Sequence, residues 1–430
     1  MAGFWKQLTK PSLNWLLVFF PIAIGLEIAH GRGVPWASAT MIFVAAAIAI
    51  IPVAGWMGHA TEHLASRLGE GVGGLLNATF GNAAELIIAL MALVEAMRHP
   101  DRVLSMHAII KASLTGSIIG NILLVLGAAL LAGGMRYKIQ RFSPLATRTS
   151  ATLMTLAIIA LTAPTLLARF VPAYAGEIHS AEVEHLSLEV AALLLVVYAL
   201  SLFFTLHTHK QLYSSGEAVE EAGIDDPVAV EAAQGHHAPW SVRKALAVLL
   251  AATACVAVLA ELMIGSVEEA SRAIGLTELF VGVIVVAIVG NAAEHSTAIL
   301  VAMRNRMDLS LAIAIGSSIQ IALFVAPALV WISYCMGVPM DLVFTVPEIV
   351  AMALAVTITA QIAGDGESNW LEGVLLLVVY VLLGALFYYL PAETHEVPPL
   401  AAATSCGLAS PSSVTSCCVA TPADSRPTAS

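Results

Sequence analysis

The sequence Gly-Asn-Ala-Ala-Glu occurs twice, at residues 81–85 and at residues 290–294, and each copy lies within a long apolar stretch. Each copy therefore places a carboxylate, Glu85 or Glu294, at a depth where a lipid bilayer is expected. A charged side chain at the bilayer centre costs about 2.5 to 3.5 kcal/mol on insertion scales, so such residues usually mark functional sites. Two matching copies predict one site built from both.

The composition predicts an all-α polytopic membrane protein. Apolar residues make up 59% of the 430 residues and charged residues only 11%, which is more apolar than a soluble domain. A spanning helix needs roughly 20 predominantly apolar residues. About eleven stretches qualify, at 13–30, 36–57, 75–97, 105–132, 150–171, 186–206, 242–265, 277–303, 308–336, 342–362 and 370–390. We therefore expect a lipid bilayer around the chain and no nucleic-acid partner.

Positive charges are distributed unequally between alternate connections. One side has twelve Lys and Arg residues, namely Lys6, Lys10, Arg67, Arg136, Lys138, Arg141, Arg148, Lys210, Arg243, Lys244, Arg304 and Arg306. The other side has six, namely Arg32, Arg98, Arg102, Arg169, Arg272 and Arg426. Because connections rich in Lys and Arg stay in the cytoplasm, we predict a cytoplasmic N-terminus and a C-terminus outside. The compact loops and alanine-rich composition favour a bacterial plasma (inner) membrane.

The two copies belong to a longer internal repeat, since Gly116-Ser117 recurs as Gly316-Ser317. Convergent use of small residues for helix packing does not explain Asn and Glu at a fixed spacing. Each unit has an odd number of spans, so the second is inverted relative to the first, as in secondary transporters. The predicted parts are an N-terminal helix (1–35), a first five-helix repeat (36–206), an acidic cytoplasmic linker (207–241), a second five-helix repeat (242–390) and a disordered tail (391–430).

The paired residues indicate a site for a hard cation. Asn82 and Glu85 are three apart and share a helix face, as do Asn291 and Glu294. The Gly-Asn start of each copy lets the backbone bend so that carbonyl oxygens can face the site. These oxygen ligands suit Ca²⁺ better than Cu or Zn. Without a cation, two facing carboxylates in a low dielectric cannot both stay ionised, so a proton binds instead. Occupancy by either Ca²⁺ or H⁺ is the minimum that exchange requires.

Polar residues downstream of each copy extend the predicted site. Ser117 and Asn121 are four apart on one helix face, and Ser317, Ser318 and Gln320 follow the second Gly-Ser pair. We predict that Ser117, Ser318 and Gln320 contribute to cation binding. The alternative for each is an ordinary bond to a carbonyl of its own helix.

Three further ionisable residues lie in or beside the apolar stretches. His295 follows Glu294, whereas Leu86 occupies the matching position of the first copy. We predict that His295 takes part in proton coupling, and the alternative is a hydrogen-bonded packing residue. Lys111 either extends to the membrane surface or pairs with a carboxylate. Glu348 is close to a helix end and is expected at the interface.

The acidic linker has two interpretations. It carries six carboxylates, at Glu217, Glu220, Glu221, Asp225, Asp226 and Glu231. It is either a solvated connection between the halves or a surface that collects or senses divalent cations through clustered oxygen ligands.

With these residues in place, the chain resembles the calcium/proton antiporters of the calcium/cation antiporter superfamily. The resemblance rests on both copies and on residues 261–268, 281–298 and 368–373, and it covers about residues 10 to 390. It implies eleven helices, one standing apart from two inverted five-helix repeats, with the ion site on the third, fourth, eighth and ninth. By matching position, Glu85 and Glu294 would carry Ca²⁺ and H⁺ in alternation. The surrounding residues would be Asn82, Asn291, Ser117, Ser318 and Gln320, and His295 also matches the family motif.

The predicted function is secondary active antiport, exchanging cytoplasmic Ca²⁺ for H⁺ by alternating access and so serving calcium ion homeostasis. The nearest alternative keeps the fold and exchanges Na⁺, K⁺ or Mn²⁺; the alanines within both copies favour protons, because sodium would require polar ligands. An intramembrane hydrolase is disfavoured because the zinc motif His-Glu-x-x-His is absent. A passive channel is disfavoured by the two inverted halves sharing one site. We expect no enzyme activity and no resident cofactor, and the sequence indicates no oligomeric state.

Overall fold

The computed structural model describes residues 13–68, 76, 79–170, 177–209 and 240–391. Apart from two very short strands, its regular elements are helical, which confirms the predicted all-α class. The principal helices are α2 (Phe19–Gly31), α3 (Ala39–Leu68), α5 (Ala83–Arg98), α6 (Val103–Ile119), α7 (Leu126–Gly134), α8 (Pro144–Phe170), α9 (Glu177–Phe203), α12 (Val242–Ile274), α13 (Glu278–Phe280), α14 (Ala287–Ala302), α15 (Met307–Gln320), α16 (Ala326–Cys335), α17 (Val346–Ile362) and α18 (Trp370–Tyr389). Two 3₁₀ turns, η1 (Leu13–Val18) and η2 (Pro100–Arg102), precede α2 and α6.

Eight helical segments in the described ranges are long and apolar enough to cross a membrane. A ninth candidate consists of Glu278–Ala292 and Glu294–Ala302, which meet at a bend of 68°. The apolar helix α17 is shorter, and α5 has 16 residues. The membrane class of the fold is therefore established, while the count of eleven spans stays a prediction.

Several helices extend beyond the predicted stretches. The longest, α12, has 33 residues and continues nine residues past the predicted end at 265. Its N-cap Ser241 accepts a hydrogen bond from the Lys244 amide, and Gly275 ends it in the left-handed conformation with φ of 76°, as helix caps commonly do. The positions 210–239 of the acidic linker, the first residues of the predicted third stretch and the tail 392–430 lie outside the described residues.

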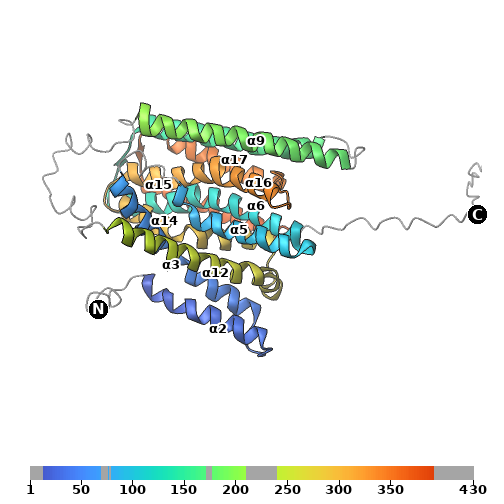
Figure 1. Ribbon diagram of the computed structural model, residues 1–430. Helices are drawn as coiled ribbons and strands as arrows, with labels where there is room; N and C mark the ends of the chain where they lie inside the picture. The colour runs from blue at the N-terminus through green and yellow to red at the C-terminus, as the bar shows by residue number, and fades with distance from the viewer. Residues whose placement is uncertain (1–12, 69–75, 77–78, 171–176, 210–239, 392–430) are drawn as a thin grey trace, which may run out of the picture. The chain divides into compact units, whose positions relative to one another are not determined.

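Helices from the two predicted repeats pack directly on one another. The long helices α3 and α12 lie side by side, with α2 against α3 (Figure 1). Helix α14 contacts α3, α5, α6, α7 and α15, so it is central to the packing. Helix α9 packs on α16, and Figure 1 shows it at the opposite edge from α2. Helix α14, which carries the second copy of the motif, is thus surrounded by other helices.

Four π-helical turns occur in the described residues. They are η3 (Gly120–Val125) between α6 and α7, η5 (Phe204–Thr208) at the end of α9, η7 (Val281–Val286) before α14, and η8 (Ile321–Val325) between α15 and α16. Turns η3 and η8 follow the two Gly-Ser pairs at corresponding places. Because π turns interrupt the regular backbone pattern and frequently occur at functional sites, their position beside both Gly-Ser pairs points to this part of the bundle.

Two very short strands form a small sheet between two of the connections. The strands β1 (Gln140–Arg141) and β2 (Glu367–Ser368) pair antiparallel, with Gln140 opposite Ser368. The Arg141 guanidinium also donates to Glu367 Oε1 at 3.1 Å. This pairing joins the connection after α7 to the connection after α17.

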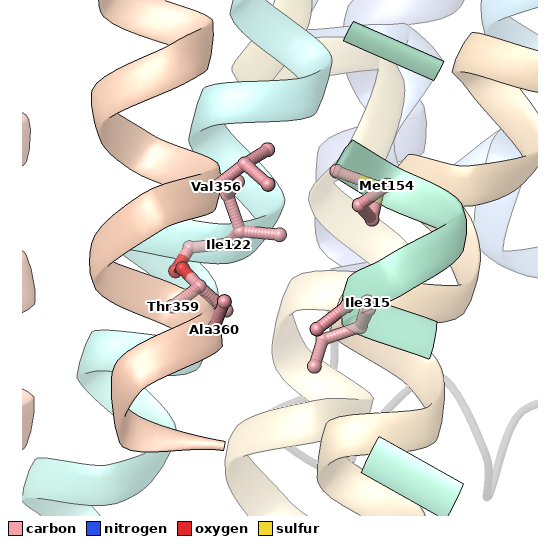
Figure 2. Close-up of a pocket in the computed structure, with 7 residues that line it drawn as sticks. Ile122, Met154, Ile315, Val356, Thr359 and Ala360 are labelled. Atoms are coloured by element: carbon pink, nitrogen blue, oxygen red, sulfur yellow. The ribbon is translucent and has the colours of Figure 1, made fainter. Parts of the chain in front are cut away.

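A small apolar pocket lies between α8, α15, α17 and η3 (Figure 2). Its lining is Ile122, Ala151, Met154, Ile315, Val356, Thr359 and Ala360. The Thr359 hydroxyl is its polar side chain, and it donates to the Ile122 carbonyl at 3.4 Å. The pocket has no carboxylate or amide side chain in its lining, so it does not suit a cation.

Candidate cation-binding site

The two Gly-Asn-Ala-Ala-Glu copies begin differently in the structure. Gly81 and Asn82 form a turn, and α5 starts at Ala83, so Glu85 lies in the first helical turn. In the second copy, Gly290 and Asn291 lie within α14, and the bend in that segment falls at the end of the copy. The expected irregular backbone at Gly-Asn is therefore present in the first copy as a helix start, whereas in the second copy Gly-Asn is helical and the bend follows it.

Asn82 connects the first copy to α15. An Asn at a helix N-cap commonly accepts a bond from its own first turn, but the Asn82 side chain makes no such bond. Its amide nitrogen donates to Gln320 Oε1 at 2.6 Å, and its oxygen accepts from the Ser317 hydroxyl at 2.6 Å. The predicted residues Asn82 and Gln320 are thus in direct contact.

Asn291 connects the second copy to α6. Its amide nitrogen donates to Ser117 Oγ at 3.0 Å and to the Ala287 carbonyl one turn earlier at 3.0 Å. Its oxygen accepts from Asn121 Nδ2 at 3.2 Å. Both Ser117 and Asn291 are buried, so their hydroxyl and amide groups are held in place without solvent.

The first carboxylate lies against the second copy. A Cβ placed on Gly290 would lie 3.1 Å from Glu85 Cγ and 3.6 Å from Glu85 Oε1. Glycine at this position therefore leaves the space that the Glu85 side chain occupies. Glu85 is 7% exposed, and neither of its oxygens has a hydrogen-bond partner among the described residues.

Glu294 shares this environment, since its Oε2 is also buried and unpartnered within the described part of the chain. Buried polar oxygens are normally hydrogen-bonded, and a buried carboxylate without a partner is costly. The two carboxylates, one from each copy, together provide three unpartnered oxygens that a proton or a cation can satisfy. The structure thus brings the predicted carboxylates into one polar, buried region.

Asn121 links the two sides of this region. Its amide nitrogen contacts Asn291 Oδ1 at 3.2 Å and Ser317 Oγ at 3.0 Å, and its oxygen lies 3.2 Å from His295 Nε2. Ser317 in turn contacts Asn82. Asn121 and Ser317 are polar neighbours of the predicted site residues in the sequence, but they are not among the residues predicted to bind the cation. Asn121 lies four residues after Ser117, and Ser317 belongs to the second Gly-Ser pair, so their positions relative to these pairs could have indicated them.

Ser318 has a different role in this conformation. Its hydroxyl donates to the Ile118 carbonyl at 3.3 Å and to the Ala314 carbonyl of its own helix at 3.2 Å. Ser318 therefore connects α15 to α6 by a hydrogen bond. Of the two serines, Ser317 is the one that contacts the Asn82 side-chain amide. The predicted part of Ser318 in cation binding stays a prediction.

Lys111 and Glu348 also have partners. The Lys111 ammonium lies 3.0 Å from Asp341 Oδ1, so it pairs with a carboxylate. Glu348 lies in the first turn of α17 and is 2% exposed, so other helices cover it, while its interfacial position stays a prediction. Its Oε1 accepts from the Thr115 hydroxyl at 3.2 Å, because the start of α17 is covered by α6.

The described residues contain no group of three or more His, Cys, Asp or Glu side chains arranged to hold a metal. The candidate site instead combines two carboxylates with amide and hydroxyl oxygens. Hard cations such as Ca²⁺ accept such mixed oxygen ligands. A membrane protein whose paired helical motifs bring together two carboxylates with buried, unpartnered oxygens has the features of a cation transporter.

Comparison with known proteins gives the family. The sodium/calcium exchanger protein family model matches residues 38–207 and 244–389. The match covers most of the chain and both copies of the motif, so this chain belongs to that family.

Individual relatives agree with this assignment. The chain is 45% identical over 379 residues to a Ca²⁺/H⁺ antiporter of Synechocystis sp., covering 87% of this chain and 96% of the relative. It is 40% identical over 376 residues to the Ca²⁺/H⁺ antiporter ChaA of Bacillus subtilis, covering 87% and 99%. The solved structure of native YfkE, at 36% identity, superposes with a TM-score of 0.71 and covers 88% of this chain and 100% of that one.

Proposed function

We propose that this chain is a secondary active transporter that exchanges Ca²⁺ for H⁺ across a membrane. The observation that carries the proposal is the pair of carboxylates Glu85 and Glu294. Both oxygens of Glu85 and Oε2 of Glu294 are buried and lack a partner among the described residues. The relatives named as Ca²⁺/H⁺ antiporters, at 40 to 45% identity over nearly their whole length, support it.

The exchange follows from what can satisfy the two carboxylates. In a buried site without a cation, repulsion and desolvation favour the uptake of protons. A divalent cation neutralises both charges, so it displaces those protons. Glu85 and Glu294 are therefore the proposed carriers of both ions, in alternation.

The surrounding amides and hydroxyls complete the proposed ligand set. The side-chain oxygen of Asn82 accepts from the Ser317 hydroxyl, that of Asn291 from the Asn121 amide, and that of Gln320 from the Asn82 amide. These neutral groups can exchange a hydrogen bond for a cation contact without leaving a buried charge. Ser117 and Ser318 are proposed to support the site, and His295 to take part in proton transfer through its contact with Asn121.

The domain organisation and orientation remain part of this proposal. We propose two inverted five-helix repeats, at residues 36–206 and 242–390, after an N-terminal helix at 1–35, with an acidic linker between them. The shared Gly-Ser pairs and their π turns support the repeat. The Arg141–Glu367 contact joins two connections assigned to the cytoplasmic side. The proposed location is a bacterial plasma (inner) membrane with the N-terminus in the cytoplasm and the C-terminus outside.

The test is Ca²⁺ uptake into proteoliposomes that contain the purified protein. An imposed pH gradient, inside acidic, should drive accumulation of ⁴⁵Ca²⁺ as protons leave. A Na⁺ or K⁺ gradient of equal size at uniform pH should not. Uptake that follows Na⁺ or K⁺ and ignores the pH gradient would keep the fold and replace the coupling ion. Adding Mn²⁺ as a competitor would measure how selective the site is for Ca²⁺.

A further inference from the structure

A polar face runs along α6 on the side away from the candidate site. His107, Lys111 and Thr115 lie on successive turns, four residues apart, so they share one helix face. This face meets α17 and the segment before it. Lys111 pairs with Asp341 at 3.0 Å, and the Thr115 hydroxyl donates to Glu348 at 3.2 Å. Thr115 and Glu348 are 0% and 2% exposed.

Glu348 makes hydrogen bonds both within the start of α17 and to another helix. One of its oxygens, Oε2, accepts from the Thr345 amide and hydroxyl, both at 2.8 Å, which completes a capping box. The other oxygen, Oε1, crosses to Thr115 on α6. In the second capping box of the chain, at the start of α18, both oxygens of Glu372 contact Asn369 of the same cap. The bond to another helix therefore distinguishes Glu348.

The opposite side of α6 meets the site. A Cβ on Gly116 would lie 2.0 Å from the Val283 carbonyl oxygen, so α6 and η7 are in backbone contact there. Ser117 then accepts the hydrogen bond from Asn291. Thr115 directly precedes these two residues. Helix α6 is thus held from both sides over three consecutive residues.

We propose that Glu348 is a positioning residue for the cation site, acting through Thr115. The bond between them fixes the rotation of α6 and so holds Ser117 and Asn121 toward the second copy of the motif. The Lys111–Asp341 pair holds the same face one turn away. The inference rests on the proposed function, because it assigns Glu348 a part in cation affinity.

The second repeat has no equivalent of this contact. Alignment of Gly116-Ser117 with Gly316-Ser317 places Met307, Leu311 and Ile315 at the positions of His107, Lys111 and Thr115. Ile315 instead lines the apolar pocket of Figure 2, together with Met154 and Val356. Of the two helices α6 and α15, therefore, α6 is the one with His, Lys and Thr at these three positions.

The experiment compares Ca²⁺ uptake by Thr115→Val, Thr115→Ser and Glu348→Ala with the wild type, under one imposed pH gradient. Thr115→Val removes the hydroxyl at nearly constant volume, and loss of a hydrogen bond to a buried charged group is expected to raise the KM for Ca²⁺ on the order of tenfold. The maximal rate should stay within about twofold of wild type if the hydroxyl acts through binding alone. Thr115→Ser should restore the wild-type KM, and Glu372→Ala, which removes the matched cap, should leave it unchanged.

The result that overturns the inference is a wild-type KM in Thr115→Val, even where the thermal stability of the purified protein falls. That outcome would mean that Glu348 caps α17 and has no part in cation affinity. If Glu348→Ala fails to fold, Thr115→Val and Thr115→Ser decide the matter by themselves. Failure of the proposed function is separate, because the wild type would then show no pH-driven Ca²⁺ uptake in the same vesicles.

Discussion

The two copies of Gly-Asn-Ala-Ala-Glu have the same residues and different surroundings. The first copy begins at a turn, and its glutamate lies in the opening turn of α5, where the helix dipole favours a negative charge. The second copy lies inside a helical segment, and its glutamate is followed by His295. Each asparagine contacts the opposite half, Asn82 through α15 and Asn291 through α6.

The candidate site is therefore built from both copies of the motif without being symmetric. Glu85 occupies the space beside Gly290, and both of its oxygens lack partners among the described residues. Glu294 has one such oxygen and an imidazole as its chain neighbour. We infer that both carboxylates are required for exchange, and that the residues around each one set affinity and proton transfer separately.

The largest effect is expected from replacing either carboxylate. Glu85→Gln and Glu294→Gln keep the side-chain shape and remove the charge that binds Ca²⁺ and the group that exchanges a proton. Each should reduce pH-driven Ca²⁺ uptake by roughly a hundredfold or more, since one carboxylate cannot replace two. Glu95→Gln is the matched control within α5, because Glu95 pairs with Arg102 at 2.9 Å and is not one of the candidate site residues. Normal exchange by either site variant would show that one copy suffices.

A smaller effect should come from the glycine of the second copy. Gly290→Ala would place a methyl 3.1 Å from Glu85 Cγ and force that side chain to shift. We expect a KM for Ca²⁺ raised on the order of tenfold, as for a displaced ligand. Gly265→Ala is the control, since a Cβ there meets no atom of the described residues within 4 Å. Equal KM values for the two variants in the uptake assay would contradict the close contact between the copies.

The smallest effect should come from making the second copy resemble the first. His295→Leu introduces the residue type found at Leu86 and removes the contact with Asn121. We expect a lower maximal rate of uptake, by roughly threefold to tenfold, because one hydrogen bond is lost while both carboxylates remain. His295→Gln, which can keep a hydrogen bond to Asn121, should retain more activity. Equal rates in both variants and the wild type would make His295 a packing residue.

The sequence selects candidate residues for the site more readily than it predicts their contacts. Repetition selects Glu85, Glu294 and both asparagines, because a polar residue in an apolar stretch stands out. The sequence alone does not decide between Ser317 and Ser318, since adjacent residues differ by about 100° in direction around a helix and the π turn η8 that follows has no composition signal.

Contacts between distant residues account for the other differences. Glu348 follows a proline near a helix start, which resembles an interfacial cap in sequence. Its burial depends on α6, more than two hundred residues earlier in the chain. Likewise, Lys111 alone gives no indication of Asp341 as its partner. Such pairs are determined by packing of the repeats, which local patterns do not encode.

The most direct test of the central claim is to count the protons released when Ca²⁺ binds. Calorimetric titration of the purified protein in buffers of different ionisation enthalpy gives this number at each pH. We predict a net release of up to two protons per Ca²⁺ and an apparent affinity that rises with pH, because protons compete with the cation for the same carboxylates. Binding of Ca²⁺ with no proton release and with an affinity independent of pH would contradict exchange at Glu85 and Glu294.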